Sequence, residues 1–192
     1  MRIGIFGGSF NPPHKLHKKI ATYLLENNYV EKVIFVPTGN RYPKEALLES
    51  QYRYHMIKEM IKDSKNMEVS DYELKNTLTY TYQTLSYFQE KFKNDKIFFI
   101  TGADNLKEIK TWKNYQYILE HFNLYVLPRK KQNVKEILSH LPNENIFALD
   151  FETEDVSSTD VRKAIKEHCE EYLNSVLDEN VLEYIRKEGL YQ

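Results

Sequence analysis

Two histidines near the start of the chain, His14 and His17, are the first side chains whose type and spacing could do chemistry. They follow an Asn11-Pro-Pro run and a glycine pair, Gly7 and Gly8. We expect these two glycines to supply backbone freedom and close approach, since neither carries a Cβ. Residues three apart share a helix face, so we expect both imidazoles to lie over one first helical turn. The unpaired N–H groups of that turn, the helix dipole and two imidazole donors together favour a polyanion such as the phosphate tail of a nucleotide.

Other interpretations of the two histidines stay open. They could ligate a metal, although no cysteine or carboxylate stands beside them at ligand spacing, so we expect no dedicated metal site. They could also be structural, capping the helix or packing in the core. The stretch lacks the G-x-G-x-x-G of dinucleotide sites and the G-x-x-x-x-G-K-[ST] of P-loops.

Three further segments lie at strand ends or helix starts: 38–44, 102–104 and 157–162. The carboxyl ends of parallel strands meet at one sheet edge, so we expect these segments to converge with residues 7–17. Gly102 allows the close approach of a ribose or base, and Asp104 could accept from a ribose hydroxyl.

The segment 157–162 offers hydroxyls and a cation. Ser157 and Ser158 bring hydroxyls and helix N-terminal amides, and Arg162 brings a bidentate fork for phosphate. Each also has an ordinary explanation: Ser157 and Asp160 have the spacing of a helix cap, Arg162 could be a solvated charge, and Trp112 could be core. Their convergence, rather than any single residue, favours a site.

The elements that position these groups follow from apolar runs and periodicity. Continuous apolar runs typical of strands covered on both faces are 3–6, 33–36, 96–102 and 124–127, with shorter strands expected at 67–72 and 146–149. Helices are expected at 12–27, with Asn11 as its N-cap, at 49–62, after Thr81, after Asp104 as a cap, at 134–141, after Ser157, and after Asp178 up to Gly189.

The order of these elements predicts the fold class. Strand alternates with helix until about residue 150, and helix alone follows, which is typical of an α/β, doubly wound, Rossmann-like parallel sheet with a small helical C-terminal segment. Since no linker is apparent, we expect residues 1–192 to form one domain, with an α/β core at 1–150 and the helical segment at 151–192.

Composition limits the function classes. The charges nearly balance, with 27 Lys and Arg against 28 Asp and Glu, so no global basic field indicates a nucleic-acid partner. Apolar runs fall far short of the ~20 residues of a membrane span, and no signal peptide is apparent. The single cysteine, Cys169, fits a reducing compartment, so we expect a cytoplasmic protein.

These motifs carry a family resemblance. Residues 7–17, Gly-Gly-Ser-Phe-Asn-Pro-Pro-His-Lys-Leu-His, and 157–162, Ser-Ser-Thr-Asp-Val-Arg, resemble the paired signatures of the HxGH nucleotidyltransferase superfamily. Within it, the sequence most resembles the bacterial nicotinate-nucleotide adenylyltransferases. Residues 79–85 resemble the SYT-x-x-TL stretch of that family, 102–112 resemble its GxDxLxxxxxW stretch, and 181–191 resemble its usual ending.

The resemblance implies the transfer of an adenylyl group from ATP to nicotinate mononucleotide, with Mg²⁺ bound along with ATP; a homo-oligomer is left open. It implies catalytic roles for His14, His17 and Arg162. It implies ATP contacts for Gly7, Gly8, Ser9, Phe10, His14, His17, Gly102, Asp104, Ser157, Ser158 and Arg162. Mononucleotide contacts are expected from Lys44, Thr81, Trp112 and Arg129, with Trp112 stacking on the pyridine and Lys44 and Arg129 meeting the phosphate.

Two departures from the family pattern keep alternatives open. Leu16 stands where HxGH has glycine, and its isobutyl group could obstruct or shift the adenine. The loop at 42–44 lacks the histidine of a PPHK-like loop. The alternatives are another acceptor (nicotinamide mononucleotide or phosphopantetheine), a cytidylyl transfer, or a catalytically silent nucleotide-binding sensor.

Overall fold

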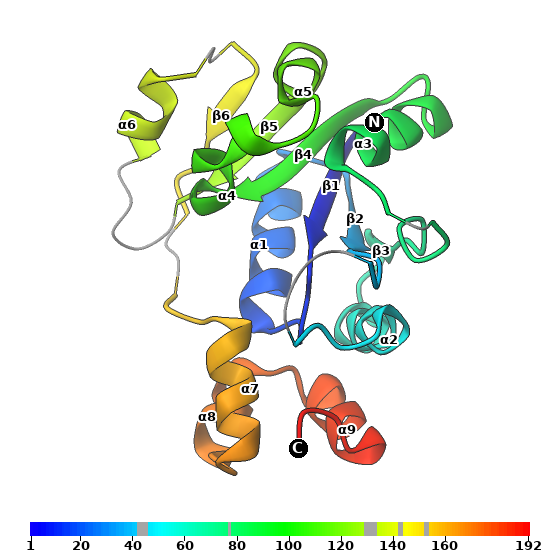
Figure 1. The fold of residues 1–192 in the computed structure, drawn as a ribbon, viewed down its shortest axis with the longest axis vertical. Helices are drawn as coiled ribbons and strands as arrows, with labels where there is room; N and C mark the ends of the chain where they lie inside the picture. Colours follow the sequence, from blue (N-terminus) through cyan, green and yellow to red (C-terminus); the bar gives the residue numbers. More distant parts are fainter. Residues whose placement is uncertain (42–45, 77, 129–133, 142–143, 152–153) are drawn as a thin grey trace.

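Within the residues that the structure describes, a six-stranded parallel sheet forms the centre of the molecule (Figure 1). The computed structural model describes residues 1–41, 46–76, 78–128, 134–141, 144–151 and 154–192. The strands are β1 (Arg2–Gly8), β2 (Lys32–Pro37), β3 (Met67–Val69), β4 (Lys96–Gly102), β5 (Asn123–Leu127) and β6 (Ile146–Ala148), in the order β3-β2-β1-β4-β5-β6. This confirms the predicted α/β class.

Helices cover both faces of the sheet. They are α1 (Lys15–Glu26), α2 (Ser50–Ile61), α3 (Thr81–Lys91), α4 (Ala103–Lys107), α5 (Tyr115–His121), α6 (Val134–Ser139), α7 (Ser158–Lys166), α8 (Glu170–Val176) and α9 (Glu179–Glu188), with a 3₁₀ turn, η1, at Ile109–Thr111. Among the described residues, no helix is long and apolar enough to cross a bilayer.

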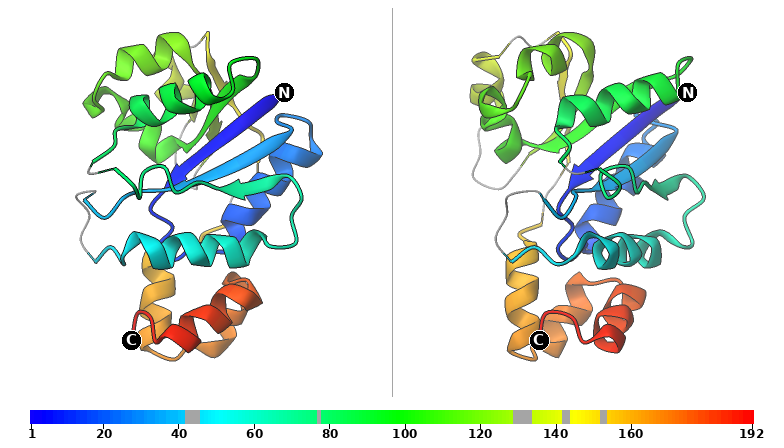
Figure 2. Two further views of the ribbon diagram at one scale, coloured as in Figure 1. Left: turned by 90° about the vertical axis from the view of Figure 1, so that its right-hand side faces the viewer. Right: turned by 45° about the vertical axis from the view of Figure 1, so that its right-hand side comes forward.

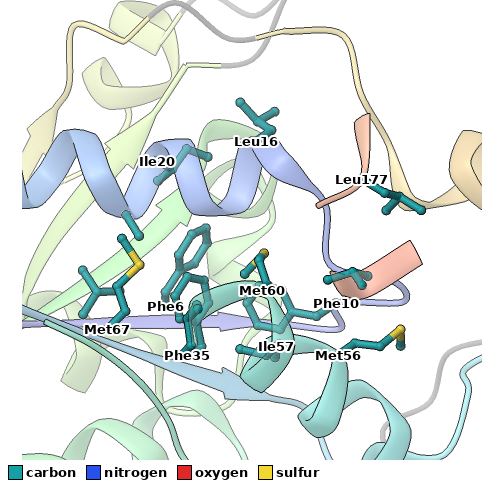
Figure 3. Close-up of a cluster of buried hydrophobic side chains, with 14 of the residues drawn as sticks. Phe6, Phe10, Leu16, Ile20, Phe35, Met56, Ile57, Met60, Met67 and Leu177 are labelled. Carbon is teal, nitrogen blue, oxygen red and sulfur yellow. The ribbon is translucent and has the colours of Figure 1, made fainter. Parts of the chain in front are cut away.

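Two apolar layers result from the alternation of side chains along the strands. On one face, Phe6 and Phe35 pack with α1 and α2, and this cluster continues into α7, α8 and α9 (Figure 3). On the other face, Ile5 and Phe99 pack with α3, α4 and α5. Because the central strands feed both layers, they are apolar throughout, which is why their positions could be read from the sequence.

The chain reverses its direction of travel across the sheet at β1. Residues 1–69 build outward from β1 to β2 and β3, whereas β4, β5 and β6 add to its other side. The loops after β1 and β4 therefore leave toward opposite faces, which opens a crevice at the carboxyl ends of these two strands.

The C-terminal helices lie beyond α1 and α2 (Figure 1). Figure 2 shows α2 between the sheet and α9, and Lys15 Nζ on α1 donates to the Asn174 carbonyl on α8 at 2.7 Å. The apolar cluster that includes Val161 and Leu182 is continuous with that of the sheet. The division at residue 150 and the single-domain organisation stay predictions.

Several element boundaries differ from those predicted. Helix α1 begins at Lys15 with His14 at its N-cap, so the predicted start at Pro12 with an Asn11 cap is wrong. Helix α4 has Gly102 at its N-cap, so the predicted Asp104 cap is wrong too. The caps at Ser157 and Asp178 are confirmed, as is the stop at Gly189, whose φ is 62°. The pattern did not predict α8, a short helix.

Candidate functional site

A cavity of about 620 Å³ lies at the carboxyl edge of the sheet, at the crevice between β1 and β4. It is lined by most of the residues that the sequence singled out: Gly7, Gly8, Ser9, Phe10, His14, His17, Thr81, Gly102, Asp104, Trp112, Ser157, Ser158 and Arg162. Lys44 and Arg129 fall outside the described residues. Segments from both ends of the chain thus share one cavity.

The cavity has two halves, one on each side of the sheet edge. One half lies against α1 and α7 and has apolar walls from Leu16, Ile20 and Val156 beside the histidines. The other half lies against α3 and η1 and includes Thr81 and Trp112. A ligand that spans the sheet edge would therefore meet imidazole and guanidinium groups at one end and hydroxyls with an indole at the other.

The two imidazoles lie together, as predicted, although only His17 is inside the helix. Their ring centroids are 3.8 Å apart, and the His14 backbone N–H donates to His17 Nδ1 at 3.1 Å. Because Nδ1 of His17 accepts this bond, the neutral ring carries its proton on Nε2. His17 is thus set as an Nε2–H donor, while Phe10 supports its ring at a centroid distance of 5.0 Å.

The turn from β1 to α1 does not use its glycines as expected. Gly7 and Gly8 belong to β1 and pair with Val36 and Pro37. The left-handed residue is Phe10, with φ 45°, rather than a glycine. The close-approach role holds at Gly8, because a Cβ there would meet the Phe10 ring at 3.1 Å. The predicted backbone freedom of this pair is therefore wrong, and Phe10 carries the strained conformation.

Arg162 reaches the same turn from α7. Its Nη1 donates to the Asn11 carbonyl at 2.8 Å, and its Nη2 donates to Thr159 Oγ1 at 3.3 Å. A guanidinium carries five N–H donors, and these bonds engage two of them. Arg162 therefore lines the cavity while its Nη1 is held by the Asn11 carbonyl. Its guanidinium has N–H groups other than these two for a ligand in the cavity.

The two serines at the start of α7 already serve local bonds. Ser157 Oγ accepts from the Asp160 N–H at 3.1 Å and donates to its carboxylate at 2.5 Å. Ser158 Oγ donates to the Pro12 carbonyl at 2.8 Å. Because Ser157 Oγ already accepts from the Asp160 N–H, the first turn of α7 offers a ligand the backbone N–H groups of Ser158 and Thr159, which have no acceptor within the helix.

Hydroxyls gather in the other half of the cavity. Thr101 is 3% exposed, and its Oγ1, like that of Thr79, has no hydrogen-bond partner among the described residues. Trp112 is half-buried and packs edge-on against Phe99 at a centroid distance of 6.0 Å. Buried hydroxyls without partners are costly unless a ligand or water completes them, so this half offers hydrogen-bonding groups to a polar ligand or to water.

A buried carboxyl lies in the same half. Glu73 accepts from Thr84 Oγ1 at 2.6 Å and lines the cavity. Burial raises the pKa of Glu73 to about 7, against the lowering effects of the Thr84 bond and of Arg53. Burial likewise lowers the pKa of Arg53 to about 10. This guanidinium is fully buried and donates to the carbonyls of Ser9 and Thr38, at 2.8 and 2.6 Å.

Leu16 lies between the two histidines in sequence but takes no part in their contact. Its side chain is 3% exposed and belongs to the core, and it also lines the cavity. In the view of Figure 3 it lies at the first turn of α1, on the other side of the helix from Phe35. The isobutyl group thus forms a wall of the α1 half and does not separate His14 from His17.

The sequence did not point to Glu73, Thr101 or Arg53 as parts of this region. Thr101 precedes Gly102 at the end of β4, so its place at a strand end was a usable signal. Glu73 lies in an irregular segment and carried no periodic signal. Arg53 stands on the buried stripe of α2, three residues before Met56 and four before Ile57, where the apolar pattern gave no reason to expect a charged group. Among the described residues, no group of three or more His, Cys, Asp or Glu could hold a metal ion.

Known proteins share both the sequence and the fold. The cytidylyltransferase-like family model matches residues 5–164. A protein of Clostridium novyi (strain NT), named "Probable nicotinate-nucleotide adenylyltransferase", is 37% identical, and the match covers 98% of each chain. A protein of the same name from Fusobacterium nucleatum is 39% identical, again over 98% of each chain.

A solved structure shows the same fold at lower identity. The Plasmodium falciparum nicotinic acid mononucleotide adenylyltransferase complexed with APC superposes with a TM-score of 0.83 at 22% identity, over 99% of this chain and 96% of that one. The same protein has been solved complexed with NaAD. The family model and the full-length relatives together show that this chain belongs to the cytidylyltransferase-like family, and within it to the nicotinate-nucleotide adenylyltransferases.

Proposed function

We propose that the protein transfers the adenylyl group of ATP to nicotinate mononucleotide, giving nicotinate adenine dinucleotide and pyrophosphate in NAD biosynthesis. One observation carries this proposal: two histidines and an arginine from distant parts of the chain, His14, His17 and Arg162, line one cavity with Trp112, Thr79, Thr81 and Thr101. The relatives that match this chain over nearly their whole length bear the name of this activity.

The reaction is an in-line displacement at the α-phosphorus of ATP. A phosphate oxygen of the mononucleotide forms the new bond, the bond from the α-phosphorus to the α,β-bridging oxygen breaks, and pyrophosphate leaves with the electron pair. The attacking phosphate is already an anion, so no general base is needed. Positioning and charge neutralisation therefore supply most of the catalysis.

In this proposal, the phosphate groups lie between α1 and α7. His17 donates from Nε2, and His14 lies beside it at the helix start, where the dipole favours negative charge. Arg162 and the first N–H groups of α7 hold the β- and γ-phosphates. The Gly7–Phe10 stretch, Gly102 and Asp104 are assigned to the rest of ATP, with Leu16 and Ile20 as apolar walls for the purine.

The acceptor occupies the other half of the cavity. Trp112 stacks on the pyridine ring, and Thr81 at the start of α3 meets the ring's carboxylate, where the helix dipole again favours an anion. Lys44 and Arg129 remain candidates for the mononucleotide's phosphate. The Thr79 and Thr101 hydroxyls, which have no hydrogen-bond partner within the part of the chain that the structure describes, support a polar ligand here.

Mg²⁺ fits this site as an ion that arrives with the triphosphate. Mg²⁺ keeps several waters and commonly binds substrate phosphates with one or two carboxylates. Asp104 is an exposed carboxylate at the cavity, and the described residues offer no larger ligand group. When bound, the ion would neutralise charge on the phosphates.

Alternatives remain for the acceptor and for turnover. The same site could accept nicotinamide mononucleotide or phosphopantetheine, and Leu16 could have made the protein a silent nucleotide sensor. We favour the enzyme because Leu16 leaves the histidine pair intact and forms a wall rather than a plug. The proposal also covers the location and assembly of the enzyme. We place it in the cytoplasm, because the exposed Cys169 thiol fits a reducing compartment. We propose no oligomeric state.

The test is a direct assay with purified protein, ATP and Mg²⁺. Pyrophosphate release is followed with nicotinate mononucleotide, nicotinamide mononucleotide and phosphopantetheine, separately and in competition, with CTP in place of ATP as a further arm. We expect release with ATP and the nicotinate acceptor above all others. Binding of ATP without release would support the sensor, and preference for another acceptor would reassign the substrate.

A further inference from the structure

A tyrosine that follows α9 holds the turn between β1 and α1 from outside the cavity. Tyr191 Oη donates to Asn11 Oδ1 at 2.9 Å. Asn11 is 1% exposed, and Tyr191 is not among the described residues that line the cavity. The bond therefore connects the far end of the chain to the phosphate-binding turn without offering a contact to a ligand.

Both polar atoms of the Asn11 side chain form hydrogen bonds, so its orientation is defined. Its Nδ2 donates to the Ala46 carbonyl at 2.8 Å, and its Oδ1 accepts from the Leu48 N–H at 3.2 Å as well as from Tyr191. These bonds fix which end of the amide is oxygen. The main-chain oxygen of Asn11 accepts from Arg162 Nη1 at 2.8 Å, so the residue that Tyr191 holds is also the anchor of that guanidinium.

Burial of the tyrosine keeps it a donor. Burial raises the pKa of the Tyr191 hydroxyl, while Arg53 and Arg162 act in the opposite direction. The hydroxyl thus stays protonated at neutral pH and can donate to Asn11. Arg53 also holds the turn directly, through its 2.8 Å bond to the Ser9 carbonyl.

We propose that Tyr191 is a positioning residue for the adenylyl transfer: through Asn11, it fixes the turn that places His14 and the carbonyl on which Arg162 rests. This inference depends on the proposed function. Small misplacements of positioning groups are costly in catalysis, because the reacting atoms must be held in line. Loss of the hydroxyl should therefore lower turnover although it touches no substrate.

The test replaces Tyr191 with phenylalanine, which keeps the ring and removes only the hydroxyl. We expect kcat for pyrophosphate release to fall about tenfold, with the KM for nicotinate mononucleotide changed less than about twofold, since the acceptor half is untouched. The folded state should survive, because Asn11 Oδ1 keeps its bond from Leu48.

Tyr23→Phe is the matched control. Tyr23 Oη donates to the Asp150 carbonyl at 2.8 Å and also interacts with the Tyr29 side chain, so this variant likewise loses the hydrogen bonding of one tyrosine hydroxyl, but away from the turn. We expect its kcat to stay near that of the unchanged protein. A Tyr191→Phe rate equal to that of Tyr23→Phe would overturn the inference.

A second readout separates this inference from the proposed function. If the unchanged protein releases no pyrophosphate, the proposed function fails, and the inference is then decided by hydrogen exchange of the amides in residues 9–17. Faster exchange there in Tyr191→Phe, but not in Tyr23→Phe, would support the positioning role. Equal exchange in both variants would overturn it.

Discussion

At the scale of single residues, the effect of the Leu16 side chain on ATP binding distinguishes an enzyme from a silent sensor. If its isobutyl group is a wall for the purine, Leu16→Ala should raise the KM for ATP severalfold, because apolar contact is lost. It should also lower the free energy of unfolding by about 2–5 kcal/mol, since the side chain is buried in the core. Steady-state kinetics and urea unfolding measure the two effects.

Leu24→Ala is the control for this change. Leu24 is fully buried on the same helix but does not line the cavity, among the residues the structure describes. It should lose similar stability while its KM for ATP stays unchanged. A lower KM in Leu16→Ala, or activity that appears only in that variant, would mean that the leucine blocks the site.

Glu73 should make stability depend on pH. Burial raises its pKa from 4.5 to about 7, so the folded protein binds this proton more tightly than the unfolded chain. The contribution is fully present below about pH 4.5 and is lost as the pH rises toward 7, for a total of up to about 3 kcal/mol.

Glu73→Gln tests this effect of pH. The amide oxygen can still accept from Thr84, but the group no longer titrates. Urea unfolding measured from pH 5 to 8 should show the variant gaining stability relative to the unchanged protein as the pH rises. Parallel pH profiles for the two proteins would contradict the assignment.

At the scale of elements, α7 positions Arg162, and its start depends on one cap. Ser157 Oγ accepts from the Asp160 N–H, as the sequence predicted. Ser157→Ala should lower the free energy of unfolding by about 1 kcal/mol, the usual cost of a lost N-cap. Ser175→Ala, whose hydroxyl bonds only the Tyr172 carbonyl within the described residues, should cost less. If the two variants lose the same free energy of unfolding in thermal or urea denaturation, the Ser157 cap does not stabilise α7.

The elements that could be predicted from the sequence are those whose burial leaves a periodic apolar pattern. The apolar runs of β1, β2 and β4 and the stripe of α2 could be read directly, because burial on two faces or on one stripe leaves a periodic pattern. The start of α1 could not be read from the sequence. Asn11 and Pro12 suit a helix start, but Asn11 instead donates to the carbonyl of residue 46 and accepts from residues 48 and 191. Such tertiary bonds leave no local trace in the sequence.

At the scale of the whole molecule, the strand order explains why remote segments meet. Parallel strands on both sides of β1 bring residues 7–17, 102–104 and 157–162 to one cavity, and this convergence was predicted from the sequence. The acceptor half was predicted less completely. Glu73 lies in an irregular segment, Arg53 is a charged residue on the otherwise apolar stripe of α2, and Lys44 and Arg129 lie outside the described residues.

The central claim is that the imidazole pair and Arg162 act on one triphosphate. The most direct measurement is the rate of pyrophosphate release by His17→Ala, with ATP, Mg²⁺ and nicotinate mononucleotide at saturation. We predict a fall of about 10²-fold, typical of losing one donor to the transition state, while His121→Ala, which changes an exposed histidine that does not line the cavity among the described residues, keeps its rate. An unchanged rate in His17→Ala would contradict the claim.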